Sequence, residues 1–307
     1  MRFTVRSPAS AANLGPGFDA LGLALDLWNE IDVETDVAGD QVRYEGAEAA
    51  LLAGSARENL AVTAMRCLAK AHKRRLPPLA LTMRTMVPVA RGLGSSATAL
   101  AAGLVVANHL LGLGLPRSEL YALAWRIEGH GDNVGAALYG GAVLAVPGIP
   151  EPVRLLTHSE LDLVAVVFVP EVTGATWAAR AALPATVPHP DAAFNVAVVG
   201  GLLLGLHTGD RALIAAGMHD RLHEPYRARL FPHLEPMANA ARQAGALGAC
   251  LSGAGPSVLA LVEANRASAV RAAYEETAAR LGLPGAARAL HPAHRGAHLQ
   301  EDQGRVE

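Results

Sequence analysis

The feature that most constrains this chain is an apolar strand-like run, a glycine- and serine-rich turn and an apolar helix-like run in direct succession. Residues 79–87 are apolar and prone to β-structure, and residues 97–111 are apolar on almost every side, as in a buried helix. Between them, the segment 92–96 contains two glycines and two serines. The first N–H groups of a helix lack intrahelical partners and lie at the positive end of its dipole, so they attract anions. The segment therefore predicts a phosphate-binding loop.

This loop differs from the lysine-containing P-loop, because Ser95 stands where that motif requires a lysine. The chain has only two lysines, Lys70 and Lys73, and both belong to a separate predicted helix. A glycine–serine linker that merely caps a core helix is the alternative interpretation, since short glycine-rich strings are weak signals alone. The local sequence leaves both interpretations open.

Composition limits the class of protein. The 307 residues are 51% hydrophobic, which suits one large domain or two ordinary ones. A net charge of -2 argues against nucleic acid as the main partner. Cys67 and Cys250 form no metal-spaced pair, so a reduced, cytoplasmic compartment is the simplest interpretation. The N-terminus lacks the apolar core of a signal peptide, and the apolar runs are interrupted, so no membrane span is expected.

The order of elements predicts two domains. A first strand is expected over residues 2–6, ended by Ser7-Pro8, followed by a loop over 9–19. Residues 20–35 are predicted to form two strands with a polar turn near 26–30. Further strands are expected at 41–45, 79–87, 142–146 and 162–169, with a short strand near 287. Residues 247–262 are expected to form two strands with a glycine turn between them. Helices are expected at 58–75, 95–111, 116–127, 173–182, 192–206, 210–217, 234–244 and 266–281.

The proline-rich segment 147–152 is the predicted boundary between the two domains. We therefore assign residues 1–150 to an N-terminal domain and residues 151–290 to a C-terminal domain. Residues 291–307 are polar with little periodicity, and we expect this tail to be loosely held.

Two polar clusters are candidates for chemistry. Asn13 and Asp19 frame a loop that could hold an ammonium or hydroxyl group, or form a polar turn through local hydrogen bonds. Glu128, His130, Asp132 and Asn133 lie within six residues and are separated by glycines. There, Glu128 could coordinate Mg²⁺ on nucleotide phosphates, and Asp132 or Asn133 could orient an attacking hydroxyl. The alternative is a helix C-cap at Gly129 followed by an N-cap at Asp132.

Other polar residues are less informative. Arg180 and Arg227 would suit a substrate carboxylate, although most single arginines are solvated. The segment 251–257 is a second glycine-rich turn between apolar strands, which forms either a hairpin or part of the same site. Two histidine sets have metal-compatible spacing but are interpreted as adventitious: His219 with His223, and the tail histidines at 291, 294 and 298.

Three motifs now stand in one order: PASAANLGPGFDALGLAL at 8–25, VARGLGSSA at 89–97 and LSGAGPSV at 251–258. Together they resemble the three motifs of the galactokinase, homoserine kinase, mevalonate kinase and phosphomevalonate kinase superfamily, and they span nearly the whole chain. The first motif, EGHGDNV at 128–134 and HEPYR at 223–227 most resemble the homoserine kinase family.

The resemblance implies an α+β fold with two domains, an N-terminal one like ribosomal protein S5 domain 2 and a C-terminal ferredoxin-like one, with the active site between them. It implies ATP-dependent phosphorylation of the side-chain hydroxyl of L-homoserine to O-phospho-L-homoserine, a step toward threonine, with ATP and Mg²⁺ as cofactors. Members of the superfamily are often dimers, which is compatible with a homodimer, but the sequence itself does not give the oligomeric state.

The resemblance also implies roles for individual residues. Asp132 and Asn133 would position the hydroxyl, and Ser96 and Glu128 would bind magnesium. The nucleotide would contact residues of the phosphate loop and three others: Val89, Ala90, Arg91, Gly92, Leu93, Gly94, Ser95, Ser96, Ala97, Asn59 and Gly255. The substrate would contact Asn13, Asp19, His130, Thr176, Arg180, Arg227, Ser252 and Gly253. One departure is notable: many homoserine kinases have a longer segment where only Gly129 separates Glu128 from His130.

Two rival functions remain open at this point. A superfamily kinase acting on mevalonate or a sugar would have less use for Asp19 and the two arginines, because those substrates lack an ammonium group. A nucleotide-binding regulator without catalysis would show a damaged phosphate loop or metal site, and neither is visible in the sequence. A test of ATP turnover separates the regulator from the kinases.

Overall fold

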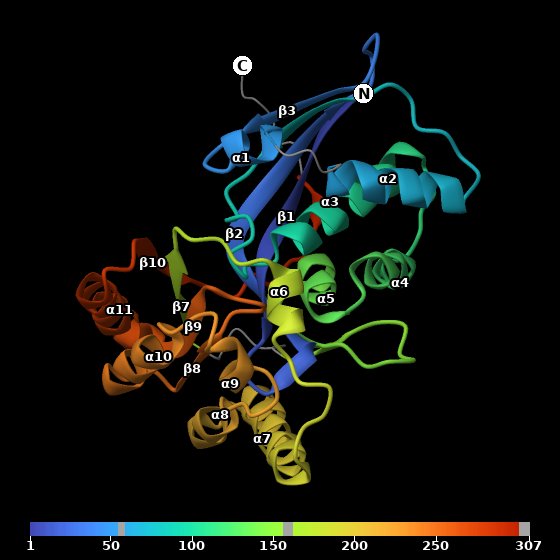
Figure 1. The fold of residues 1–307 in the computed structure, drawn as a ribbon. Coiled ribbons are helices and arrows are strands. Elements are labelled where there is room, and N and C mark those ends of the chain that lie inside the picture. Colours follow the sequence, from blue (N-terminus) through green and yellow to red (C-terminus); the bar gives the residue numbers. More distant parts are fainter. Residues whose placement is uncertain (55–58, 156–161, 301–307) are drawn as a thin grey trace.

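The computed structural model describes residues 1–54, 59–155 and 162–300. Within these residues the chain forms two β-sheets, each with helices packed against it (Figure 1). The first sheet has the order β11-β1-β2-β4-β3, with β5 pairing with β2 and β6 with β5. Its strands are β1 (Arg2–Asn13), β2 (Gly17–Glu34), β3 (Gln41–Glu45), β4 (Ala80–Arg84), β5 (Ala142–Leu144), β6 (Val153–Arg154) and β11 (His298–Leu299). Only the pairing of β3 with β4 is parallel among these strands.

The second sheet is antiparallel, in the order β10-β7-β9-β8. Its strands are β7 (Leu163–Pro170), β8 (Gly248–Leu251), β9 (Val258–Glu263) and β10 (Gly285–Leu290). Alternate residues of β7 belong to two hydrophobic cores: Val164, Val166 and Phe168 face one, and Leu163, Ala165 and Val167 face the other. Both faces of this sheet are therefore covered, as the fully apolar sequence of β7 indicates.

The helices complete these layers. They are α1 (Ala49–Ala53), α2 (Leu60–Ala71), α3 (Ser95–Leu110), α4 (Arg117–Glu128), α5 (Asp132–Tyr139), α6 (Thr176–Ala181), α7 (His189–Thr208), α8 (Arg211–Gly217), α9 (Glu224–Arg227), α10 (Leu234–Gln243) and α11 (Ala267–Leu281), with a short 3-10 turn at Ala264–Arg266 before α11. Helices α2–α5 contribute to the core against the first sheet, whereas α10 and α11 pack on the second. A third core joins β1 and β2 to β7, α7 and α8, so the two halves share buried surface.

The first two strands are longer than the sequence predicts. Strand β1 does not end at Ser7-Pro8 but continues to Asn13, because the register shift between Pro8 and Ala9 places the proline at a bulge. On the partner strand, Ala9 pairs with Leu25 and Pro8 with Trp28, so the polar segment near residue 26 is part of this bulge. The segment expected as two strands with a turn over residues 20–35 is instead part of one bulged strand, Gly17–Glu34.

The C-terminal tail differs most from its prediction. Residues 291–300 are not loosely held, because β11 pairs with β1 and Ala293 and Ala297 are buried. Backbone hydrogen bonds fix the segment further, from Gly141 N to Ala293 O and from Ala297 N to Ala137 O. The polar composition of the tail gave no strand pattern, and its partners lie far away in the sequence. Residues 301–307 lie outside the described residues, as does Glu58 at the expected start of α2.

The first sheet extends past the proline-rich segment, because β6 (Val153–Arg154) pairs with β5. Helix α7 has the length and apolar composition of a membrane span, and within the described residues no other helix does. A single helix of this kind is weak evidence for membrane insertion, because the helix of a protein core passes the same test.

Candidate functional site

A cavity of about 650 Å³ is lined by residues of both halves of the molecule. Its walls include the loop before α3, the end of α4, the start of α5, the first residue of α6, the last residue of α9 and the turn after β8. Every site residue predicted from the sequence lines this cavity except Ala97 and Ser252. Ala97 is fully buried in the first core, and Ser252 lies behind the loop that precedes α3. The structure thus brings together residues that are separated by more than 200 positions in the sequence.

The loop before α3 has the backbone that an anion site requires. Ala90, Gly92 and Gly94 have φ angles of 55°, 74° and 66°. A Cβ atom on Gly94 would lie 2.0 Å from Ser10 Oγ, and one on Gly92 would lie 2.2 Å from the carbonyl oxygen of Ser252. Glycine is therefore required at both positions by close packing as well as by φ. Ser95, Ser96 and Thr98 of the first turn of α3 line the cavity, and the first N–H groups of a helix have no intrahelical partner.

Two side chains tie this loop to the second half of the chain: Ser252, which belongs to that half, and Arg91, which belongs to the loop. Ser252 donates a hydrogen bond from Oγ to the Gly92 carbonyl oxygen at 2.7 Å. Arg91 donates to the carbonyl oxygens of Pro170 and Glu171, both at 3.0 Å, and forms an ion pair with Glu48 at 3.2 Å. Its guanidinium group is therefore largely used within the protein, and we assign Arg91 to loop support.

Ser96 and Glu128 lie together at the start of α3 and the end of α4. The Ser96 hydroxyl donates to Glu128 Oε1 at 2.6 Å, and both residues line the cavity. The short connection through Gly129 is accommodated because this glycine, with φ of 90°, ends α4 in the left-handed conformation. A hydroxyl and a carboxylate oxygen beside an anion-binding loop are hard oxygen ligands of the kind that Mg²⁺ prefers.

The segment after Gly129 places three polar side chains at the cavity. His130 Nδ1 lies 2.5 Å from Asp132 Oδ1, which also accepts the Asn133 backbone N–H at 2.6 Å. Burial disfavours the charged imidazole, but the hydrogen bond to Asp132 and the nearby carboxylates outweigh it and raise the pKa of His130. The other oxygen of Asp132, Oδ2, is buried without a hydrogen-bond partner among the described residues. Asp132, which lines the cavity, therefore retains one acceptor atom that no described residue uses.

Asp19 and Arg180 form a two-pronged ion pair across the cavity. The Arg180 Nη1 and Nη2 atoms lie 3.0 and 2.8 Å from the two Asp19 oxygens, which raises the pKa of Arg180. Burial, together with Arg180, lowers the pKa of the neighbouring Arg227. The Phe18 ring lies near both guanidinium carbons, 5.8 Å from that of Arg180 and 5.3 Å from that of Arg227. This end of the cavity thus contains both signs of charge.

One group of side chains has the spacing of a metal site within the described residues: Asp19, His130 and Asp132 place ligand atoms within 4.8 Å of one another. Asp19 is already paired with Arg180 and His130 with Asp132, so internal interactions account for the cluster.

Two predicted ligands use their polar atoms within the protein. Asn13 accepts the Asp19 N–H through Oδ1 at 3.1 Å, as in a polar turn, and donates from Nδ2 to Gly253 O of the second half at 2.9 Å. Asn59 caps α2 by accepting from Ala61 N and Val62 N. Both line the cavity, but their amide groups mainly hold the backbone.

Several lining residues were not predicted. Tyr44, Leu52, Met83 and Thr85 lie on the cavity wall that Asn59 shares. Their sequence signals are ordinary for strands and short helices, and the pairing of β3 with β4 brings Tyr44 beside Met83. Phe18, whose ring lies near the guanidinium groups of Arg180 and Arg227, was also missed.

Comparison with known proteins gives the family. Models of the GHMP kinase N-terminal and C-terminal domains match residues 59–141 and 202–280. A homoserine kinase from Synechococcus sp. (strain WH7803) is 43% identical over 298 residues, covering 95% of this chain and 94% of the relative. Another from Gloeobacter violaceus is 45% identical over 288 residues, covering 89% and 92%. This chain belongs to the homoserine kinase family of the GHMP kinases.

Solved structures agree with this assignment. The homoserine kinase from Cytophaga hutchinsonii has a TM-score of 0.87 at 29% identity, with 97% of each chain covered. A putative homoserine kinase from Listeria monocytogenes has a TM-score of 0.77 at 30% identity, covering 98% of this chain and 100% of the other. The mevalonate kinase of L. major shares the fold alone, with a TM-score of 0.69 at 17% identity, covering 96% of this chain and 97% of the other. The expected two-domain α+β kinase fold is thereby confirmed.

Proposed function

We propose that this protein transfers the γ-phosphoryl group of ATP to the side-chain hydroxyl of L-homoserine, which yields O-phospho-L-homoserine for threonine biosynthesis. Family membership supports the reaction class. The observation that carries the choice of acceptor is the ion pair of Asp19 with Arg180, beside Arg227, in the same cavity as the phosphate loop. A carboxylate and two cations match the opposite charges of an amino acid.

Substrate binding would replace one ion pair with two. The ammonium group of L-homoserine would pair with Asp19, and its carboxylate would pair with Arg180 and Arg227. Thr176 and His130 line the same cavity and would contact the remaining polar atoms. An acceptor without an ammonium group, such as mevalonate or galactose, would leave the Asp19 charge without a new partner.

The residues Ser96 and Glu128 fit a magnesium ion, since their oxygen atoms lie 2.6 Å apart at the mouth of the phosphate loop. When bound, Mg²⁺ neutralises negative charge on the phosphate oxygens of ATP. The backbone N–H groups at the start of α3 would contribute to the same neutralisation.

Phosphoryl transfer depends mainly on positioning and charge neutralisation. Asp132, through its unpartnered Oδ2, and Asn133 would hold the acceptor hydroxyl in line with the γ-phosphorus. Orientation of this kind can supply about 7–11 kcal/mol of the barrier. The hydroxyl oxygen then bonds to the γ-phosphorus while the bond to ADP breaks, and the proton passes to an oxygen of the transferred phosphoryl group. Asp132 in this mechanism positions the hydroxyl and does not act as a dedicated base.

Finer assignments follow from the family resemblance and the composition. We propose that the first half is S5 domain 2-like, that the second is ferredoxin-like, and that the domains span residues 1–150 and 151–290. The two free cysteines, Cys67 and Cys250, suit a cytoplasmic location. A homodimer without nucleic-acid or membrane partners completes the proposal.

The test is release of ADP from MgATP in a coupled assay with L-homoserine, mevalonate, galactose or no acceptor. Release that depends on L-homoserine supports the proposal. Release only with mevalonate or galactose would support kinase activity but exclude the proposed amino-acid binding site. ATP binding without release for any acceptor would favour the regulator.

A further inference from the structure

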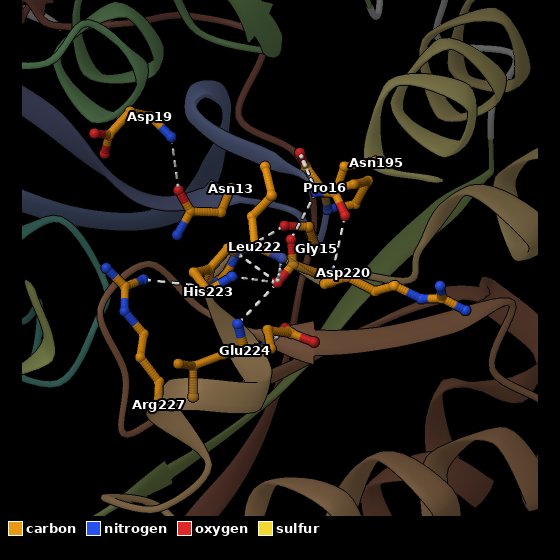
Figure 2. Close-up of polar contacts among 12 residues, drawn as sticks. Asn13, Gly15, Pro16, Asp19, Asn195, Asp220, Leu222, His223, Glu224 and Arg227 are labelled. Atoms are coloured by element: carbon orange, nitrogen blue, oxygen red, sulfur yellow. Dashed lines mark hydrogen bonds and ion pairs between the residues drawn. The ribbon is translucent and has the colours of Figure 1, made fainter. Parts of the chain in front are cut away.

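A buried polar network lies directly behind Arg227, and its central member is His223 (Figure 2). In the sequence, His223 begins the HEPYR motif and has a metal-compatible spacing with His219, but neither feature assigns it a role. In the structure the His223 side chain is completely buried, whereas His219 is exposed. A buried imidazole with several partners needs an explanation, because unpaired polar groups are costly in a protein interior.

The partners of His223 define its hydrogen positions. Nε2 lies 2.8 Å from the carbonyl oxygen of Gly15, which can only accept, so Nε2 carries the hydrogen. Arg227 Nη1, which can only donate, lies 3.3 Å from Nδ1, so Nδ1 must be the acceptor. Burial and the charge of Arg227 outweigh the opposing charge of Asp220 and lower the pKa of His223. The imidazole is therefore neutral and bridges Gly15 to Arg227.

Hydrogen bonds within the protein restrain two of the three guanidinium nitrogens of Arg227, Nε and Nη1. Its Nε donates to Ala179 O at 3.2 Å, and its Nη1 donates to Gly253 O at 3.1 Å as well as to His223. Nη2 has no hydrogen-bond partner among the residues that the structure describes, and Figure 2 shows it directed away from His223. Because Arg227 lines the cavity, Nη2 is the donor left for an anionic group of the acceptor.

The other end of the bridge holds the loop that carries Asp19. Gly15 has a φ of 84°, and Asn13, Leu14 and Asp19 adopt left-handed φ angles of 73°, 49° and 55°. Such angles are unfavourable for side chains other than glycine, so the loop needs external contacts to keep its shape. The hydrogen bond from His223 to Gly15 is one of these contacts.

Asp220 and Asn195 fix the position of His223 at the start of α9. Asp220 Oδ2 accepts the backbone N–H groups of Leu222, His223 and Glu224 at 2.7–3.1 Å and thus fixes the start of α9. Asn195 Nδ2 donates to Asp220 Oδ1 at 2.8 Å and to Pro16 O at 3.3 Å. The network therefore runs from α7 through His223 to both charged ends of the acceptor site.

We propose that His223 is a positioning residue for acceptor binding: its neutral imidazole fixes the Gly15 loop and orients Arg227 so that Nη2 faces the acceptor carboxylate. The identity of the acceptor rests on the proposed function. The role of His223 can be tested separately from the overall reaction. It predicts that loss of the His223 hydrogen bonds to Gly15 and Arg227 weakens binding of the acceptor and not of MgATP.

The test compares His223→Leu, which has no hydrogen-bonding group, with His223→Gln, which retains a donor and an acceptor. His219→Leu is the matched control, since this exposed histidine lies four residues earlier in the same segment. Steady-state rates are measured with L-homoserine and MgATP varied independently, and thermal unfolding checks that each variant is folded.

The Leu variant is expected to raise KM for L-homoserine by about 10- to 100-fold, because a charged hydrogen bond is lost or misdirected. KM for MgATP and kcat should change by less than about threefold. The Gln variant should recover most of the loss, and His219→Leu should match the wild type. An unchanged KM for L-homoserine in the folded Leu variant would overturn the proposal, and so would equal losses for both substrates, which would indicate a general structural role.

A measurement on the unaltered protein covers the case in which His223→Leu does not fold. The side-chain ¹⁵N shifts of His223 should report a neutral ring with hydrogen on Nε2, and a charged ring or hydrogen on Nδ1 would overturn the proposal. If the wild type releases no ADP with L-homoserine, the proposed function fails, and calorimetric binding of L-homoserine to the same variants then tests His223. Absence of binding to the wild type would overturn both.

Discussion

The replacement Asp132→Asn separates positioning of the acceptor hydroxyl from general base catalysis. In the structure, Asp132 Oδ1 is held by His130 and by the Asn133 backbone N–H, whereas Oδ2 has no partner among the described residues. Asparagine can keep the Oδ1 contacts and replaces the free acceptor with an NH₂ donor. A hydrogen bond to a charged group contributes about 1.5–3 kcal/mol, so kcat should fall by about 10- to 150-fold.

Stability should change differently from activity. Because the replaced oxygen is a buried acceptor without a partner, loss of its charge should leave the free energy of unfolding unchanged or increase it. The pKa of His130 should fall, since its hydrogen bond to a carboxylate raises it in the wild type. Coupled ADP release measures kcat, urea unfolding measures stability, and ¹H NMR titration follows His130.

Two results would refute this reasoning. An unchanged kcat would show that Asp132 does not touch the reacting hydroxyl. A loss above about 10³-fold in a stable variant would instead indicate a general base, whose contribution is typically 10²–10⁴-fold.

Three further predictions concern the loop, the pH dependence and the tail. Gly94→Ala should abolish ATP binding measured by calorimetry, because the new Cβ would lie 2.0 Å from Ser10 Oγ at a φ of 66°; retention of normal affinity would contradict the close packing. Burial raises the pKa of Glu224 from 4.5 to about 8, so the folded state retains a proton that the unfolded chain loses. The stabilisation present below about pH 4.5 should therefore disappear as the pH rises through about 8. In urea unfolding, Glu224→Gln should lack this fall in the free energy of unfolding with pH. If the free energy of unfolding depends on pH in the same way in the variant and the wild type, the pKa shift is excluded. Gly296→Val should destabilise the protein by about 1–3 kcal/mol in urea unfolding, because a Cβ there would lie 2.1 Å from the Leu138 backbone; a wild-type midpoint would argue against the docked tail.

The sequence was most informative where local pattern and chemistry coincide. The succession of an apolar strand, two glycines and a buried helix predicted the phosphate loop, and the structure places that loop at a cavity. Asp19, Arg180 and Arg227 were suggested by their charges and by the family resemblance. Their proximity depends on packing between the two halves, which no local pattern specifies.

Features set by long-range pairing could not be predicted in the same way. The bulge at Pro8 is favourable only because β2 supplies two extra residues opposite it, and β11 has no strand pattern of its own. For polar residues, the sequence identified the types but not their partners. Arg91 and Asn59 have the chemistry of ligands, yet their side chains mainly hold a loop and a helix.

The most direct test of the central claim is identification of the product formed from MgATP and L-homoserine by ³¹P and ¹H NMR. We expect one phosphomonoester on the side-chain oxygen of L-homoserine, formed in equal amount to ADP. ADP with free phosphate and unmodified L-homoserine, or a phosphate on another atom, would contradict the account of this site.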